Sequence, residues 1–349
     1  MSALPPRFNP RLLQPPTVIP PALRHWLGSL LKGPPRGRRQ RHKQACVLAL
    51  GRIGDFVLCL PALRLFVHQF GADQVTLVVQ PGVSSLAAIE LPGVELVTLP
   101  SEAGSFLREI VPLWWRERRK FATVGFERQI TLSHYRPIVH ELIASWVDAK
   151  QDFRLVPATY PPAGPEGQCT ELEAHRLVAA AALNRPVAWE EIIPSFVQFP
   201  AGNNDRLLVY PLSHDGSKNI PAERIISILQ PWRARNPAAV VFGGSPRDAA
   251  ELERYAAAAR AAGLGKVSVE TPAGVPAFIA HVAAAGGMLA TDSAAGHVAG
   301  AFDKPAVVLI AREWYGLSQP WRKSGQQHAF ALEAPDAEIA AALPALGSK

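Results

Sequence analysis

The sequence predicts an α/β protein built from two doubly wound, Rossmann-like domains with a central cleft. Three observations support this fold class. Short apolar runs alternate with longer segments of helical period, the alternation breaks near the middle of the chain, and it then starts again. With 349 residues and 48% hydrophobic content, the chain can fill two cores. Ligands of such domains bind at the carboxyl ends of the parallel strands.

The first half of the chain contains five apolar runs that predict strands, with helical segments between them. The strands are expected at residues 46–51, 75–80, 94–99, 122–126 and 153–156. The helices are expected at residues 56–70, 102–120, 137–150 and, after a stretch rich in proline and glycine, 171–184.

The second half repeats this architecture after another break at residues 194–204. Its strands are expected at residues 207–212, 239–243, 266–270, 288–291 and 306–310. Its helices are expected at residues 221–236, 247–263, 275–285, from Ala294 onward, and at 336–343. The last helix, stopped by Pro344, is interpreted as crossing back onto the first domain. The predicted domains are therefore residues 45–200 and 201–349.

Residues 1–44 are predicted to form a separate basic arm. Nine Lys and Arg residues precede position 44, and no acidic residue occurs before Asp55. Subtracting these nine charges from the total of +7 leaves −2 for residues 44–349. Prolines favour disorder over residues 1–22, residues 21–32 have the pattern of a short amphipathic helix, and residues 36–43 are polybasic.

This arm has several interpretations. The helix and the basic stretch, residues 21–43, suit an anionic membrane surface. Alternatively, the helix packs on its own domain while the basic side chains are solvated, or the arm is a targeting peptide. Nucleic acid is not favoured as a partner, because the sequence has neither an aromatic-interleaved basic face nor zinc-ligand spacing.

The compartment is inferred from the cysteines and from hydropathy. Cys46, Cys59 and Cys169 show no paired or metal-ligand spacing, which favours reduced thiols and a cytoplasmic location. No apolar run in the sequence reaches the roughly 18 residues that span a bilayer. The expectation is a cytoplasmic protein that the arm can attach peripherally to the inner face of the cytoplasmic membrane.

In the first domain, the segment with candidate chemistry is Leu-Gly-Arg-Ile-Gly-Asp, residues 50–55, where the first strand turns into the first long helix. The spacing of its glycines matches neither the dinucleotide fingerprint nor a Walker A loop, so no cofactor is predicted. Asp55 has two interpretations. It caps the helix, or it is a general base that faces the cleft.

In the second domain, three loops follow strands at what should be one edge of the sheet. Residues 213–218 read Ser-His-Asp-Gly-Ser-Lys, residues 243–245 read Gly-Gly-Ser, and residues 292–297 read Asp-Ser-Ala-Ala-Gly-His. Taken singly, each allows an ordinary explanation as a solvated loop or a helix cap. Together they predict a diphosphate held by helix N-termini and Lys218, with a nucleoside beside Ser245.

Three motifs, in this order, resemble the heptosyltransferase-like glycosyltransferases of family 9. The first is Gly-Asp-Phe-Val-Leu-Cys-Leu-Pro-Ala-Leu at residues 54–63, and the second is Ser-His-Asp-Gly-Ser-Lys-Asn-Ile-Pro at residues 213–221. The third begins at Asp292 and ends at Pro305. The resemblance spans roughly residues 45–325.

The resemblance implies a GT-B fold and an inverting, metal-independent glycosyltransferase. ADP-heptose is the leading candidate for the nucleotide-sugar donor, and a lipopolysaccharide core or related glycan or glycolipid is the implied acceptor. Asp55 is implied as the catalytic base. The implied donor-binding residues are Ser213, His214, Lys218, Ser245, Asp292, Ser293, Ala294, Ala295 and His297. No metal or cofactor is expected, since the sequence lacks an Asp-x-Asp cluster.

Two departures from the family pattern leave the donor sugar open. Ala294 stands where the family usually has glycine, and His214 stands where a hydroxyl residue is frequent. Two other functions are also considered: a sugar-nucleotide epimerase of the same fold, and a non-catalytic adaptor that docks through the basic arm.

Overall fold

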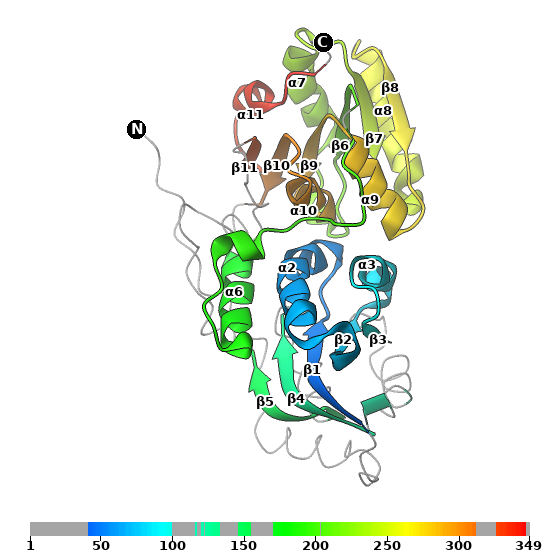
Figure 1. Cartoon of the computed structure of the whole chain (residues 1–349). Coiled ribbons are helices and arrows are strands. Elements are labelled where there is room, and N and C mark those ends of the chain that lie inside the picture. The colour runs from blue at the N-terminus through cyan, green and yellow to red at the C-terminus, as the bar shows by residue number, and fades with distance from the viewer. Residues whose placement is uncertain are drawn as a thin grey trace, which may run out of the picture. The chain divides into compact units, whose positions relative to one another are not determined.

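The computed structural model describes residues 41–99, 116, 120–121, 123–132, 146–154, 170–202, 204–311 and 326–346. They form two compact units, which we treat separately (Figure 1). The N-terminal unit holds the described residues from 41 to 154 together with Leu172–Ile192, and the C-terminal unit holds Thr170, Glu171 and the described residues from Ile193 onward. The division after Ile192 lies beside the break predicted at residues 194–204. Residues 1–40 of the predicted arm lie outside the described residues.

The N-terminal unit contains a parallel five-stranded sheet with the order β3-β2-β1-β4-β5. Its strands are β1 (Arg41–Ala49), β2 (Val75–Val79), β3 (Glu95–Thr98), β4 (Val124–Thr131) and β5 (Asp148–Phe153). Its helices are α2 (Ile53–Phe70), α3 (Ser84–Glu90) and α6 (Thr170–Leu183), with short 3₁₀ turns η2 (Ala72–Gln74), η3 (Pro81–Val83) and η7 (Trp189–Ile192). The order changes direction between β1 and β4, so α2 begins at the switch point of this sheet.

Strand β1 starts at Arg41, five residues before the predicted start, and so includes the end of the predicted polybasic stretch. Lys43 is buried in this strand, and its Nζ lies 2.7 Å from Oε2 of Glu95. The Thr76 hydroxyl also donates to that carboxylate, at 3.1 Å. Because Glu95 supplies a counterion, a charged residue is accommodated in the strand, and Lys43 does not belong to a free basic surface.

Strand β5 occupies residues that the sequence had predicted to end a helix at residue 150 and to start a strand at residue 153. Among the described strands it pairs only with β4, at the edge of the sheet, and its sequence is Asp-Ala-Lys-Gln-Asp-Phe. Edge strands carry charged residues on their solvated face, so the apolar pattern of a strand is missing. Most of the helices predicted at residues 102–120 and 137–150 lie outside the described residues.

Helix α2 is the central helix of the N-terminal unit. It is the one described helix that is long and apolar enough to cross a membrane by length and composition. However, it connects β1 to β2 of one sheet, and 56% of its 18 residues are buried. Gly71, with φ +89°, ends the helix in a conformation that favours glycine. We therefore interpret α2 as a core helix. Cys46 of β1 and Cys59 of α2, both predicted as reduced core residues, are buried and form no disulfide among the described residues, whereas Cys169 lies outside the described residues.

The C-terminal unit contains a parallel six-stranded sheet with the order β11-β10-β9-β6-β7-β8. Its strands are β6 (Arg206–Tyr210), β7 (Ala239–Gly243), β8 (Val267–Glu270), β9 (Gly287–Thr291), β10 (Ala306–Ile310) and β11 (Gln327–Ala331). Its helices are α7 (Ala222–Arg233), α8 (Ala249–Ala261), α9 (Val275–Ala284), α10 (Ala294–Ala301) and α11 (Asp336–Ala342), with 3₁₀ turns η8 (Gly216–Lys218) and η9 (Pro246–Asp248). The strand order changes direction between β6 and β9.

Two features of this unit differ from the sequence prediction. Strand β11, Gln-His-Ala-Phe-Ala, was not predicted, because this edge strand lacks an apolar run. The proposal that the last helix crosses back onto the first domain was wrong: α11 packs against α7, and Ile339 belongs to the same buried core as Trp232. An ion pair of 2.9 Å between Arg224 and Asp336 holds this packing.

The segment that enters the C-terminal unit is fixed to it. The ring of Phe196 lies 4.6 Å from that of Phe302, and the Gly202 amide donates to the Ala283 carbonyl at 2.9 Å. The buried ammonium of Lys304 donates to the Gly202 carbonyl, and burial lowers the pKa of this lysine. The chain is thus anchored in the C-terminal unit by residue 202.

Candidate functional site

The loops after β6 and β9 leave the C-terminal sheet at its switch point and bring together two of the predicted site residues. Nζ of Lys218 lies 2.6 Å from Oδ2 of Asp292, although the two residues are 74 positions apart. The Asp292 side chain is 6% exposed and that of Lys218 is 19% exposed. The lysine is therefore held in place by a nearly buried carboxylate and still has solvent access.

The backbone of the β6–α7 loop is also fixed. The Thr291 hydroxyl, at the end of β9, donates to the carbonyl of Lys218. Asp215 accepts from the amide of Ser217 at 3.1 Å and from its hydroxyl at 2.8 Å. The Ser213 amide donates to Oδ1 of Asn219 at 2.8 Å. These bonds distinguish the loop from a loosely solvated connection and set the position of Lys218.

Beside Lys218, helix α10 begins immediately after Ser293. Ser293 has extended backbone angles, φ −151° and ψ 174°, and its buried Oγ has no hydrogen-bond partner among the described residues. A buried hydroxyl without a partner costs about 1–3 kcal/mol, so a ligand that binds it recovers this cost. The helix N-terminus favours an anion at the same place.

Small residues bring α10 close to the sheet. A Cβ on Gly296 would lie 3.0 Å from Val308 Cγ2, so glycine lets the helix approach β10. Ala294 is partly exposed at the helix start, whereas Ala295 is buried. His297 is also buried, on the same helix. The sequence placed these residues at a helix start after a strand, and the structure confirms that placement.

The third predicted loop, after β7, is organised around a cap. The Ser245 hydroxyl donates to Oδ2 of Asp248 at 2.5 Å, and the Ser245 amide donates to the same oxygen at 3.1 Å. This side chain therefore starts η9, and its contact with a nucleoside remains a prediction. In the same loop, Nη2 of Arg247 lies 3.2 Å from Nδ1 of His214, which belongs to the Lys218 loop.

In the N-terminal unit, Asp55 is the third residue of α2. Its Oδ2 accepts a hydrogen bond of 2.8 Å from the amide of Arg52, which confirms the capping interpretation. A Cβ on Gly51 would lie only 2.3 Å from Cβ of Asp55, so glycine at position 51 makes room for this carboxylate. No described residue donates to Oδ1. The cap thus orients the carboxylate and leaves one oxygen available.

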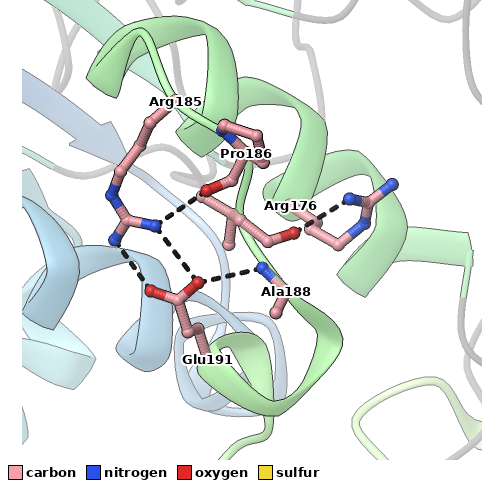
Figure 2. A network of polar contacts seen from close by, with 6 residues as sticks. Arg176, Arg185, Pro186, Ala188 and Glu191 are labelled. Carbon is pink, nitrogen blue, oxygen red and sulfur yellow. Dashed lines mark hydrogen bonds and ion pairs between the residues drawn. The ribbon is translucent and has the colours of Figure 1, made fainter.

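Helix α6 contacts α2 one turn after Asp55, through His175. Cys59 of α2 lies 3.7 Å from Nε2 of His175, whose Nδ1 lies 3.2 Å from the carbonyl of Leu58. Figure 2 shows the polar contacts that fix the end of this helix to η7: Arg185 pairs with Glu191 at 2.7 Å, and Arg176 donates to the carbonyl of Val187 at 2.9 Å. The hydrogen bond to Arg185 is the main reason that the pKa of Glu191 is lowered.

The sequence did not reveal a chain of polar contacts that leads from the buried Tyr210 and His281 to the partly exposed Glu270 and Arg206. The Tyr210 hydroxyl lies 2.9 Å from Nδ1 of His281, Nε2 of His281 lies 3.0 Å from Glu270, and Glu270 lies 2.7 Å from Nη1 of Arg206. Burial lowers the pKa of His281, and the Glu270 charge opposes this shift. Burial also raises the pKa of Tyr210. Gly243 leaves space for the tyrosine ring, since a Cβ there would lie 2.5 Å from Cε2 of Tyr210.

Residues 175–342 match the model of Glycosyltransferase family 9 (heptosyltransferase). A search of curated protein sequences gives no significant match. Three solved structures that resemble the chain are a heptosyltransferase WaaC from E. coli with ADP, the E. coli ADP-heptose LPS heptosyltransferase II, and a family 9 glycosyltransferase from Veillonella parvula.

WaaC has a TM-score of 0.64 and 14% identity, with 85% of this chain and 95% of WaaC covered. Heptosyltransferase II has a TM-score of 0.60 and 14% identity, with 86% of this chain and 97% of that protein covered. The Veillonella protein has a TM-score of 0.57 and 15% identity, with 87% of this chain and 89% of that protein covered. At these identities the likeness establishes the fold, and it confirms the GT-B class predicted from the sequence. The match of residues 175–342 to the family 9 (heptosyltransferase) model confirms the predicted resemblance and supports glycosyltransferase activity.

Proposed function

We propose that this protein is an inverting, metal-independent glycosyltransferase that transfers heptose from ADP-heptose to a lipopolysaccharide core or a related glycan. The observation that carries the proposal is the Lys218–Asp292 pair of 2.6 Å beside the start of α10. Two of the similar structures, both of WaaC, contain ADP or ADP-2-deoxy-2-fluoro heptose, which supports an ADP-sugar as donor.

The donor diphosphate binds between Lys218 and the N-terminus of α10 in this proposal. Ser293 offers its buried hydroxyl, and the small side chains of Ala294 and Ala295 let the phosphate approach the helix start. Negative charge increases on the diphosphate as its bond to the anomeric carbon breaks. Lys218, already oriented by Asp292, therefore stabilises the transition state more than the bound donor. His297 supports the helix from its buried face.

Asp55 acts as the general base. Its Oδ2 is held by the Arg52 amide, and its Oδ1 takes the proton from the acceptor hydroxyl. The acceptor oxygen attacks the anomeric carbon on the face opposite the diphosphate, so a new glycosidic bond forms, the bond to the diphosphate breaks, and the anomeric configuration inverts. No divalent cation takes part, because Lys218 and the helix N-terminus receive the developing charge.

The test compares the wild type with the Asp55→Asn variant in a transfer assay read by mass spectrometry, with ADP-heptose and a lipopolysaccharide core acceptor. Asparagine still accepts the hydrogen bond from Arg52 but cannot take the proton. We expect turnover to fall about 100-fold or more while donor affinity is unchanged. EDTA should leave the wild-type rate unaltered. An equal loss of donor binding and of rate would refute the assignment of the base.

The same assay separates the alternative functions. A product formed from the donor without acceptor would indicate an epimerase. If Asp55→Asn has no effect in cells while deletion of residues 1–40 abolishes the phenotype, the protein is an adaptor.

We also propose that the protein is cytoplasmic and attaches peripherally to an anionic membrane through residues 21–43, with Arg36, Arg38 and Arg39 as its main basic contacts. Lys43 contributes little, because it is paired with Glu95. Vesicles with phosphatidylglycerol should bind the full chain in a salt-sensitive manner, and a chain without residues 1–40 should not bind. Equal sedimentation of both chains would contradict this.

A further inference from the structure

We propose that Arg247, oriented by His214, is a second cation of the donor site and binds phosphate charge that Lys218 leaves unbalanced. The inference rests on the proposed function and deepens it, because it assigns a residue that selects nucleoside diphosphates over monophosphates. Its starting point is the contact of 3.2 Å between Nη2 of Arg247 and Nδ1 of His214.

The charge balance of the site leaves part of the charge of a bound diphosphate unpaired. Lys218 lies 2.6 Å from Asp292, so this pair carries no net charge. The N-terminus of α10 adds the equivalent of about half a positive charge. A diphosphate carries more negative charge than this arrangement balances. A further positive side chain within reach would therefore strengthen binding of the diphosphate more than binding of a monophosphate.

The sheet topology places Arg247 next to the Lys218 loop. Strands β6 and β7 are parallel neighbours, with Val209 opposite Phe242, so the loops that follow them leave the sheet side by side. His214 belongs to the first loop and Arg247 to the second. Among the described residues that follow the strands of this sheet, at 211–220, 244–248, 271–274, 292–293 and 332–335, the Lys and Arg side chains are Lys218 and Arg247.

The surroundings of Arg247 leave its guanidinium available. Its Nε lies 3.6 Å from Oδ1 of Asp248, a long ion pair, and its side chain is 64% exposed. The other oxygen of Asp248 already accepts from the hydroxyl and the amide of Ser245. Asp215, on the Lys218 loop, is likewise engaged by Ser217. The planar fork of an arginine is well suited to bind phosphate oxygens in pairs.

His214 orients the arginine. When an arginine N–H donates to Nδ1, that nitrogen is an acceptor, and the proton of the neutral ring lies on Nε2. The contact thereby holds the guanidinium beside the Lys218 loop. Replacing His214 should have a smaller effect than replacing Arg247, because the charge remains.

The test is calorimetric titration of the full chain with ADP, UDP, AMP and adenosine. Of ADP and UDP, the ligand that the wild type binds more tightly is the reference. We expect Arg247→Ala to weaken binding of this diphosphate about tenfold or more, to weaken AMP binding less, and to leave adenosine binding unchanged. Arg247→Lys keeps the charge without the fork and should give an intermediate value. His214→Ala should lower the diphosphate affinity less than Arg247→Ala does.

The matched control is Arg254→Ala, since Arg254 is 76% exposed on α8 of the same unit and pairs with Glu251. If Arg247→Ala binds ADP and UDP like this control while Lys218→Met binds them weakly, the inference about Arg247 is overturned and the donor site stands. If the wild type binds neither diphosphate, or if Lys218→Met binds both normally, the proposed donor site fails and the inference fails with it. Cooperative thermal unfolding above the temperature of the titration confirms that each variant is folded, including Lys218→Met, which should melt at a lower temperature than the wild type.

Discussion

The Lys218–Asp292 pair can be tested by a double-mutant cycle. At 2.6 Å, Coulomb's law with an effective dielectric constant of about 20 gives roughly 6 kcal/mol of attraction. In each single variant the remaining charged side chain relaxes and gains hydration, which lowers the expected coupling free energy to about 2 kcal/mol. Lys218→Met should destabilise the C-terminal unit by about 3 kcal/mol, because the carboxylate of Asp292, only 6% exposed, loses its counterion.

The partner substitution, Asp292→Asn, should cost less, since the Lys218 side chain is 19% exposed and can turn to solvent. The double variant Lys218→Met/Asp292→Asn should be more stable than the sum of the single effects predicts. The assay is urea unfolding of the full chain read by pulse-labelled hydrogen exchange, with peptides from β6 and β9 reporting on the C-terminal unit. Additivity errors of about 0.3–0.5 kcal/mol are well below the expected coupling.

The same variants separate stability from binding. The double variant should regain stability but should still bind ADP weakly, because the phosphate has lost Lys218. Additive free energies of unfolding would show that Nζ and Oδ2 form no ion pair in solution. Full ADP affinity in the double variant would remove Lys218 from the phosphate site.

Three further predictions concern the core of the C-terminal unit. Burial lowers the pKa of His281, so the contribution of this histidine to stability is complete above its unfolded pKa of about 6.5 and is lost as pH falls below that value. In urea melts between pH 7 and 5, the free energy of unfolding should therefore fall less steeply with decreasing pH in His281→Gln than in the wild type. The same slope in both proteins would contradict this. Trp232→Phe removes the indole N–H that donates to the Pro344 carbonyl at 2.7 Å and should lower the free energy of unfolding in urea by about 1–3 kcal/mol. A loss below about 0.5 kcal/mol would mean that the carbonyl finds another donor. Gly243→Ala places a methyl group 2.5 Å from the Tyr210 ring and should cost about 1–3 kcal/mol in the same assay, whereas a neutral effect would show that the ring moves freely.

The sequence was sufficient for the elements that are buried on both sides. The runs at β2, β6, β7, β9 and β10 are mostly apolar, and the structure has strands there with bounds close to the predicted ones. The errors fall where burial is incomplete. Strands β5 and β11 are polar edge strands, and β1 starts among basic residues because Glu95 neutralises Lys43. A hydrophobic pattern cannot indicate a strand whose side chains are paired or solvated.

The sequence predicted which loops carry the site residues, but it did not predict most of the contacts that fix these residues. Placing Ser213, Lys218 and Asp292 after parallel strands required only the alternation of elements, and the structure joins Lys218 to Asp292 as the shared sheet edge implied. The partners that fix these residues are distant in sequence and lack a motif. Thr291 holds the Lys218 backbone and Arg247 reaches His214 only because β6 lies between β9 and β7.

The central claim is that a nucleoside diphosphate binds at the carboxyl edge of the C-terminal sheet. A crystal structure of the full chain with ADP tests it most directly. We expect phosphate oxygens within about 3 Å of Nζ of Lys218 and of Oγ of Ser293, at the start of α10. A diphosphate bound at another place, with the Lys218–Asp292 pair not in contact with it, would contradict the account.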